Sequence, residues 1–188
     1  MTALDPAELV LGVGGNLGDD QAILGRFAAV AAALEAWSTV RTSRVWRTQA
    51  LGPDQPDFLN AALLVEVPDD LRGLPLLREL QALEHTLGRR RADEVRWGPR
   101  PIDLDLLLWG PRQIDHRGPP ALTIPHPRLA TRAFALLPAI DLVGPALVLP
   151  GSSPPRTLGQ LATAVADQAV TLTDHTIAGA VPAVATST

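Results

Sequence analysis

The sequence predicts an α+β domain in which strands and helices follow the order β-α-β-β-α-β. Two observations lead to this order. Short apolar runs alternate with two longer segments whose apolar residues recur every three or four positions, which is the spacing of an amphipathic helix. The second and third apolar runs are joined by a loop too short for a crossover helix, so the sheet is expected to be antiparallel or mixed.

The first half of the chain supplies the first strand, the first helix and the next two strands. Leu9–Val13 is an apolar run that ends in two glycines, as expected for a buried strand followed by a turn. Asp19 is placed to cap the following helix. The apolar positions of that helix are Ile23, Phe27, Val30, Leu34 and Trp37. Segments 40–48 and 58–67 are predicted to be strands, and a loop rich in glycine and proline separates them.

The second half of the chain supplies the second helix and the third confident strand. Pro75 suits the first turn of a helix, and Gly88 suits its end. The apolar positions between them are Leu76, Leu80, Leu83 and Leu87. Ile102–Trp109 is a nearly continuous apolar strand. The remaining predicted elements are a short strand at Leu122–Ile124 and helices at Arg128–Leu137 and Leu158–Ala166.

These elements together predict a ferredoxin-like β-α-β-β-α-β sheet covered by helices in a three-layer α/β/α arrangement. We find no internal repeat and no linker between domains, so residues 1–188 are expected to form a single domain. Small apolar and hydroxyl-bearing residues dominate after about residue 178, which predicts a frayed tail.

The composition excludes several kinds of chemistry. The chain has 188 residues and no cysteine, so disulfides, thiolate metal ligands and cysteine nucleophiles are ruled out. All 16 basic residues are arginine, which excludes a Walker-type phosphate-binding lysine and a Schiff-base lysine. The glycine-rich segment 12–18 therefore cannot be a Walker loop, and its spacing also differs from the dinucleotide-binding fingerprint.

The charge and hydropathy predict a cytoplasmic protein. A net charge of −4 argues against non-specific binding of nucleic acid, which needs a basic surface. The longest apolar stretch, Ala133–Pro150, is interrupted by proline, glycine and aspartate, so we expect no membrane span. The first eight residues contain no basic side chain, unlike a signal peptide.

Two carboxylates in the apolar strand at 102–109 are the sharpest indication of chemistry. Asp103 and Asp105 are two positions apart, so they project from one face of the strand with Cα atoms roughly 7 Å apart. Buried carboxylates this close repel each other unless a cation neutralises them, and oxygen ligands suit Mg²⁺. A pair of such ions would form a clamp for phosphoryl transfer. The alternative is a strand face that is open to solvent.

Arginines gather immediately before that strand. Those within twelve residues of one another are Arg89, Arg90, Arg91, Arg96 and Arg100. Arginine binds phosphate through paired, charge-assisted hydrogen bonds, and arginines combined with a metal are the usual means of holding a polyphosphate. A solvated charged loop is the alternative interpretation.

Two further groups of residues could bind a substrate. His126 and Arg132 are spaced to contact a phosphate, although a capping histidine and a surface arginine would also fit. Phe58 and Asn60 share one strand face and, with Phe134, could bind a flat heterocycle that forms hydrogen bonds. The alternative is that both phenylalanines belong to the core.

These segments together resemble the 6-hydroxymethyl-7,8-dihydropterin pyrophosphokinase family of folate biosynthesis. The resemblance covers roughly residues 10–145. Its most specific string is Arg96-Trp-Gly-Pro-Arg-Pro-Ile-Asp-Leu-Asp105. The supporting strings are Leu-Gly-Val-Gly-Gly-Asn-Leu-Gly at 11–18, Pro-Asp-Phe-Leu-Asn at 56–60 and Ile-Pro-His-Pro-Arg-Leu-Ala-Thr-Arg-Ala-Phe at 124–134.

The resemblance implies transfer of the β,γ-diphosphate of ATP to the pterin hydroxymethyl oxygen, with release of AMP. It implies that Asp103 and Asp105 hold two Mg²⁺ ions and that Arg89 and Arg100 act on the transferred phosphates. The residues implied to bind ATP are Gln81, Glu84, Arg89, Arg91, Trp97, Arg100, His126 and Arg132. Those implied to bind the pterin are Thr48, Leu51, Phe58, Asn60, Trp97, Asp103 and Phe134. We expect a monomer whose partners are these two small molecules.

Two other kinds of protein remain to be distinguished. A polymerase-β-like nucleotidyltransferase also combines a glycine turn with an Asp-x-Asp strand, but in those enzymes the two lie close in sequence, whereas here nearly ninety residues separate them. Its product would be pyrophosphate instead of AMP. A non-catalytic ferredoxin-like module that binds nucleotides would show no turnover of ATP with any pterin.

Overall fold

The computed structural model describes residues 4–50, 52, 54–71, 73–91, 98–178 and 181–182. Its centre is a sheet with the strand order β5-β1-β4-β2, in which each neighbouring pair is antiparallel. These strands are β1 (Glu8–Gly15), β2 (Arg41–Thr42), β4 (Phe58–Glu66) and β5 (Asp103–Trp109). Strand β3 (Trp46–Thr48) pairs with β4 along the same edge as β2 does. Strand β3 also pairs with β8 (Val170–Leu172).

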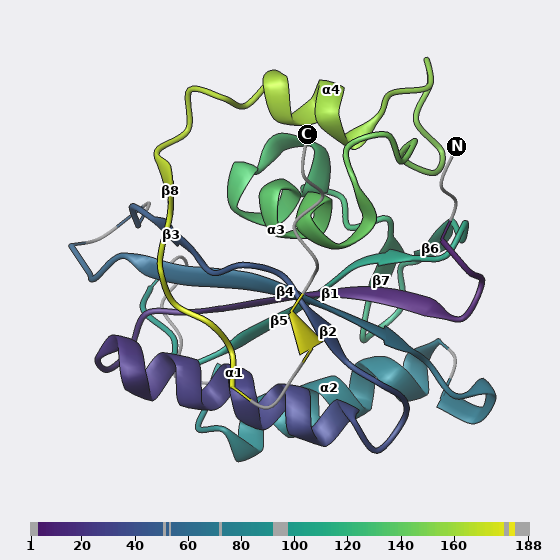
Figure 1. Ribbon diagram of the computed structural model, residues 1–188. Coiled ribbons are helices and arrows are strands. Elements are labelled where there is room, and N and C mark those ends of the chain that lie inside the picture. The colour runs from purple at the N-terminus through teal and green to yellow at the C-terminus, as the bar shows by residue number, and fades with distance from the viewer. Residues whose placement is uncertain are drawn as a thin grey trace.

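Helices cover both faces of this sheet (Figure 1). On one face lie α1 (Asp20–Leu34) and α2 (Leu74–Thr86), and on the other lie α3 (Ala133–Val143) and α4 (Leu158–Thr163). The smaller elements are the 3₁₀ turns η1 (Asp69–Leu71) and η3 (Leu129–Thr131), and the ladder of β6 (Ile114–His116) with β7 (Leu122–Ile124). The predicted α+β class, with an antiparallel sheet and helices packed on it, is confirmed.

Alternation along the central strands divides the core into two parts. Leu9, Leu11 and Val13 of β1 pack with the apolar faces of α1 and α2. Val10 of the same strand packs with α3 and α4 on the opposite face. Gly12 and Gly14 lie on that second face too, and both line a cavity there. The small residues of β1 therefore leave space above the middle of the sheet.

The helix boundaries follow local signals in the sequence. Asp19 accepts a hydrogen bond from the Ala22 amide at 2.8 Å and so caps α1, as expected. Pro75 lies in the first turn of α2, and Gly88 follows that helix with φ +98°. None of the helices in the described ranges is both long and apolar enough to cross a bilayer.

The single strand predicted over 40–48 is wrong, because the structure has two short strands there. Thr42 is opposite Leu63 and Trp46 is opposite Asn60, so three residues on one strand face two on the other. The Ser43 hydroxyl accepts a hydrogen bond from the Ala62 amide at 2.8 Å inside this bulge. A side chain thus takes the place of a ladder carbonyl and interrupts the strand.

Three predictions for the C-terminal half also need correction. The helix predicted over 128–137 begins only at Ala133, because Arg132 has the extended dihedrals φ −128° and ψ 109°. The helix predicted over 158–166 ends at Thr163. Within the predicted frayed tail, β9 (Val181–Pro182) pairs in parallel with β2. Strand β8, at Val170–Leu172, was not predicted because its three residues are too few for a periodic pattern.

Candidate active site

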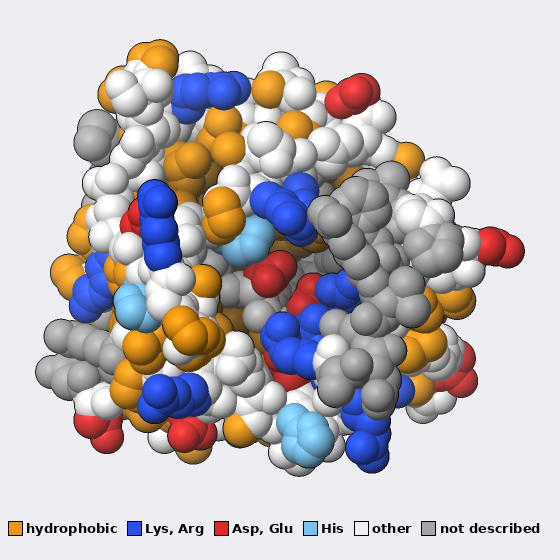
Figure 2. Space-filling model, turned by 180° about the vertical axis from the view of Figure 1, so that it is seen from behind, with side chains coloured by type: hydrophobic (Ala, Val, Ile, Leu, Met, Phe, Trp, Pro, Cys, Tyr) orange, Lys and Arg blue, Asp and Glu red, His pale blue; other side chains and the backbone are white. Residues whose placement is uncertain are grey.

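A cavity of about 680 Å³ opens on the α3 side of the sheet. Strands β1, β4 and β5 contribute to its lining, as do segments 126–135 and 168–169. Basic, acidic and histidine side chains gather in a hollow in the view of Figure 2. The predicted site residues that line the cavity are Thr48, Phe58, Asn60, Arg100, Asp103, Asp105, His126, Arg132 and Phe134. Residues far apart in the sequence are therefore brought together around one space.

Asp103 and Asp105 lie on the cavity face of β5, where they alternate with the buried residues Leu104 and Leu106. Their side chains are 28% and 36% exposed, so they are neither in the core nor on an open surface. Asp103 accepts hydrogen bonds from Arg89 and, at 3.1 Å, from Arg100. The Nε2 atom of His126 lies 3.9 Å from an Asp105 carboxylate oxygen. The strand face predicted from the two-residue spacing therefore lines the cavity.

The electrostatic environment of the two carboxylates is uneven. Burial and the neighbouring Asp103 charge raise the pKa of Asp105 to about 7. Among the described residues no guanidinium donates a hydrogen bond to Asp105, and the charges of Arg132 and Arg89 offset its raised pKa only in part. Within the described residues, no group of three or more acidic or histidine side chains could hold a metal ion by itself. A cation at this pair would need further oxygen ligands from water or a bound substrate.

His126 faces this pair as a neutral imidazole. Burial and the positive charges of Arg132 and Arg128 lower the pKa of His126 to about 4. Its Nδ1 atom accepts a hydrogen bond from the Arg128 amide at 3.2 Å. Since a neutral imidazole carries one proton, that proton belongs on Nε2, the atom that faces Asp105. The His126 side chain is therefore a hydrogen-bond donor toward the cavity.

Glu84 does not line the cavity but supports it from below. The Glu84 side chain in α2 is 2% exposed, and its Oε1 accepts from the Leu104 amide at 2.8 Å and from Arg89 at 2.5 Å. Its Oε2 accepts from Arg91, whose own side chain is half exposed. Gln81 in the same helix is half-buried and is likewise absent from the cavity lining. Glu84 therefore joins α2 to β5 and holds Arg89 beneath Asp103.

The aromatic and amide residues form the other part of the cavity lining. Phe58 and Phe134 are both half-buried there, whereas Phe27 is completely buried in the core. Asn60 is 6% exposed and donates a hydrogen bond to the Thr48 hydroxyl. Phe58 and Phe134 thus present part of their surface to the cavity, while Phe134 also packs against the apolar cluster of α3 and α4. Leu51 and Trp97, which were predicted to complete this pocket, lie outside the described residues.

Asn16 does not line the cavity, but it supports the cavity residue Arg100 and was not among the predicted site residues. Its buried side chain donates to Gln55 Oε1 at 3.0 Å and to the Pro56 carbonyl at 2.9 Å. Its Oδ1 accepts from the Arg100 amide at 2.8 Å. Asn16 therefore ties the segment before β4 to the segment before β5. The string at 11–18 contained this signal, because an asparagine can satisfy donors and acceptors at once.

Comparison with known proteins identifies the chain. Residues 10–144 match the model of the 7,8-dihydro-6-hydroxymethylpterin-pyrophosphokinase family. The chain belongs to this family. The family resemblance inferred from the sequence strings, over roughly residues 10–145, is thus confirmed.

Individual pyrophosphokinases support the same assignment. The chain is 37% identical to the 2-amino-4-hydroxy-6-hydroxymethyldihydropteridine pyrophosphokinase of Synechocystis sp., over 71% of this chain and 65% of that protein. It is also 37% identical to the enzyme of the same name from Methylorubrum extorquens, over 80% of this chain and 91% of that protein. The mitochondrial folate synthesis bifunctional protein of Arabidopsis thaliana is 44% identical over 50% of this chain and 16% of its own length.

The pyrophosphokinase model does not extend to the C-terminal part of the cavity. Gln168 and Ala169 line the cavity, yet they lie beyond the matched residues 10–144. Our sequence analysis placed no site residue there, because neither residue belongs to a recognisable motif.

Proposed function

We propose that this chain transfers the β,γ-diphosphate of ATP to the hydroxymethyl oxygen of 6-hydroxymethyl-7,8-dihydropterin and releases AMP, in folate biosynthesis. One observation carries the proposal. A single cavity combines two phenylalanines and a buried amide with two carboxylates, a histidine and several arginines. The first group suits a flat heterocycle that forms hydrogen bonds, and the second suits a polyphosphate.

The pterin is proposed to bind between Phe58 and Phe134. Aromatic faces stack on a planar ring and leave its edge available for hydrogen bonds. Asn60 lies on the same face of β4 as Phe58 and presents an amide that can both donate and accept. Its hydrogen bond to Thr48 fixes the orientation of that amide before a ligand arrives.

The triphosphate is proposed to lie against Arg100, Arg132 and His126. Within the described residues, the buried Nε atom of Arg100 has no hydrogen-bond acceptor, so it can donate to a phosphate oxygen. Burial and the neighbouring Arg128 lower the pKa of Arg132, which indicates a crowded positive environment that an anion would relieve. The Nε2–H of His126 adds a neutral donor on the same side.

Asp103 and Asp105 fit two Mg²⁺ ions, because they offer carboxylate oxygens on one strand face. Asp105 is the better indication, since burial and the charge of Asp103 raise its pKa to about 7 even though the charges of Arg132 and Arg89 lower it. Bound ions of this kind would neutralise charge on the phosphates during transfer. Arg89 and Arg100, both hydrogen-bonded to Asp103, hold that carboxylate in place for the ions.

The finer features of the fold and setting are also proposed. The order β5-β1-β4-β2 with antiparallel neighbours supports the ferredoxin-like topology of a β-α-β-β-α-β chain. A monomer in the cytoplasm is also proposed, as we expected from the family resemblance and the composition.

The purified protein should produce AMP from ATP and 6-hydroxymethyl-7,8-dihydropterin in the presence of Mg²⁺. The reaction can be followed by separating AMP, ADP and pyrophosphate chromatographically, with omission of the pterin as the control. AMP at only the no-pterin background would contradict the proposed reaction. Pyrophosphate as the nucleotide-derived product would instead favour a nucleotidyltransferase.

Phe58→Ala and Phe134→Ala should each weaken pterin binding about tenfold or more, on the scale of one lost stacking contact. Binding of a non-hydrolysable ATP analogue should change far less, because the stacking faces are proposed to contact the pterin ring. Phe58→Ala gives the cleaner separation, since the Phe134 ring also lies 5.2 Å from the Arg132 guanidinium carbon. Stacking persists from the bound substrate to the transition state, so the loss should appear in KM more than in kcat. Calorimetry with the analogue followed by the pterin separates the two effects. Loss of analogue binding in both variants would contradict the proposal that the pterin and the triphosphate occupy separate parts of the cavity.

A further inference from the structure

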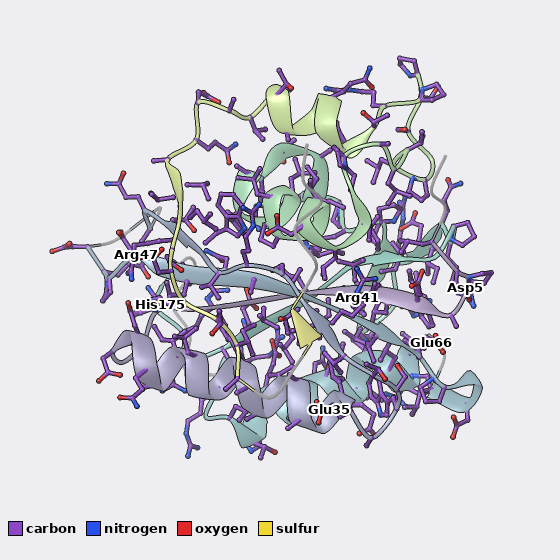
Figure 3. The ribbon with its side chains drawn as sticks, viewed as in Figure 1. Asp5, Glu35, Arg41, Arg47, Glu66 and His175 are labelled. Carbon is purple, nitrogen blue, oxygen red and sulfur yellow. The ribbon has the colours of Figure 1, made fainter. Side chains whose placement is uncertain are left out.

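The C-terminal segment 158–178 reaches the cavity from outside the residues that match the family model. Helix α4 packs on α3 in the same apolar cluster, and β8 pairs with β3 so that Val170 is opposite Thr48. His175 Nε2 lies 2.8 Å from Asp20 Oδ2, which also accepts from Arg47 at 2.6 Å. Figure 3 shows Arg47 and His175 close together at this edge of the sheet. The segment is therefore anchored on both sides of Gln168.

The side-chain amide of Gln168 makes two hydrogen bonds to the backbone at the start of α3. Its Oε1 accepts from the Ala133 amide at 2.9 Å, and its Nε2 donates to the Thr131 carbonyl at 2.9 Å. These two groups belong to the peptide units on either side of Arg132. The first amides of a helix have no partner within that helix, so Gln168 satisfies one of them.

The consequence of this pairing is a fixed backbone at Arg132. A side-chain amide that bonds both flanking peptides imitates a neighbouring strand and holds the extended dihedrals of Arg132. Two cavity residues depend on that conformation. The guanidinium carbon of Arg132 lies 5.2 Å from the centre of the Phe134 ring, and both side chains line the cavity.

We propose that Gln168 is a positioning residue, which sets Phe134 against the pterin and Arg132 against the triphosphate. The inference rests on the proposed use of the cavity for these two substrates. It assigns a binding role to a part of the chain beyond residues 10–144. Gln168 acts through Arg132 and Phe134, so its effect should be on substrate binding more than on the chemical step.

Gln168→Met tests the role, because methionine keeps the length of the side chain and removes both hydrogen bonds. Gln160→Met is the matched control. Gln160 also bonds to the backbone, accepting from the Thr157 amide at 2.9 Å in the capping box of α4, but it does not line the cavity. Phe134→Ala serves as the reference for loss of the pterin face.

Gln168→Met should raise KM for the pterin and for ATP about five- to tenfold and change kcat less than about twofold, on the scale of two lost hydrogen bonds. Gln160→Met should lower the melting temperature about as much as Gln168→Met does, but it should leave the KM values for the pterin and for ATP unchanged. Gln168→Glu keeps the acceptor for the Ala133 amide but sets a carboxylate oxygen against the Thr131 carbonyl, so its KM values should be at least as high as those of Gln168→Met. Gln168→Glu also carries the test if Gln168→Met does not fold at the assay temperature.

The outcomes separate this inference from the proposed function. If Gln168→Met has the KM values of Gln160→Met while Phe134→Ala raises the pterin KM, the positioning role is wrong and the proposed pterin site stands. If Phe134→Ala also leaves the pterin KM unchanged, the cavity is not the pterin site and the inference fails with it. A Gln168→Glu variant with wild-type KM values would overturn the role assigned to the Thr131 hydrogen bond.

Discussion

Replacing Asp105 with Asn should lower AMP formation by about a hundredfold or more and, at the same time, stabilise the protein in the absence of metal. The loss of activity is expected because a neutral amide is a poor ligand for Mg²⁺ and leaves the charge of the phosphates without compensation. The gain in stability is expected because burial and the charge of Asp103 raise the pKa of Asp105 to about 7. The Asp105 carboxylate, although required for activity, would thus lower the stability of the metal-free protein.

The gain in stability should depend on pH in a defined direction. The Asp105 carboxyl ionises near 3.8 in the unfolded chain and near 7 in the folded protein. Between these values the folded state holds a proton that the unfolded state has lost, so this group's contribution to stability falls as pH rises and is lost above about pH 7. Asparagine cannot ionise, so its advantage should grow from pH 5 to pH 8.

Asp103→Asn is the matched control, because Asp103 lies two residues away on the same strand face. Asp103 accepts from Arg89 and Arg100, so its replacement removes the counter-charge of two arginines and should lower the melting temperature. Both variants should lose activity. Melting curves in EDTA at pH 5, 6 and 8 make the comparison. Equal destabilisation by both substitutions at pH 8 would show that the Asp105 carboxylate does not lower the stability of the metal-free protein.

The parts of this molecule that follow from local pattern were predictable from the sequence. The apolar run at 102–109 fixed the position of β5, and the two-residue spacing of Asp103 and Asp105 placed both on its cavity face. The cap at Asp19 and the end of α2 at Gly88 follow from the same kind of short-range signal. Periodicity and capping depend only on neighbouring residues, which is why these predictions succeeded.

The features that depend on tertiary contacts were not predictable. The bulge after Thr42 arises because the Ser43 hydroxyl meets an amide of β4, a strand about twenty residues away. The family resemblance implies that Glu84 binds ATP, whereas its contacts with Arg89 and the Leu104 amide arise from packing between α2 and β5. Gln168 reaches the cavity because α4 packs on α3 and β8 pairs with β3, and no motif surrounds it. Each of these roles depends on a contact with a residue that is distant in the sequence, and the sequence alone does not show which residues come into contact.

Loss of Arg100 and loss of Arg89, the two arginines bonded to Asp103, should affect different properties of the protein. The Arg100 side chain is 19% exposed, lines the cavity and has a buried Nε without an acceptor among the described residues. Arg100→Ala should therefore lower kcat and kcat/KM together by about a hundredfold, the scale of one lost electrostatic donor in the transition state. Its melting temperature should change little, because no buried charge loses its only partner.

Arg89→Ala should instead unfold the protein at a lower temperature as well as reduce activity. The Arg89 side chain is 4% exposed and lies 2.5 Å from the buried Glu84 carboxylate. Breaking a buried pair on one side costs about 3–5 kcal/mol, and the lower end applies here because Arg91 and the Leu104 amide still donate to Glu84. For a chain of this size that corresponds to a fall of roughly 6–12 °C in the melting temperature.

A second substitution at Glu84 separates the structural part of the Arg89 effect from any catalytic part. Glu84→Gln added to Arg89→Ala removes the buried carboxylate charge that has lost its Arg89 partner, and it keeps the length of the side chain. The double variant should therefore recover part of the lost stability. Activity should stay low in the double variant, because the guanidinium that holds Asp103 is still missing. Melting curves and AMP formation for wild type, both single variants and the double variant complete the cycle. Recovery of activity together with stability would mean that Arg89 serves only to neutralise Glu84, and its proposed role at Asp103 would be wrong.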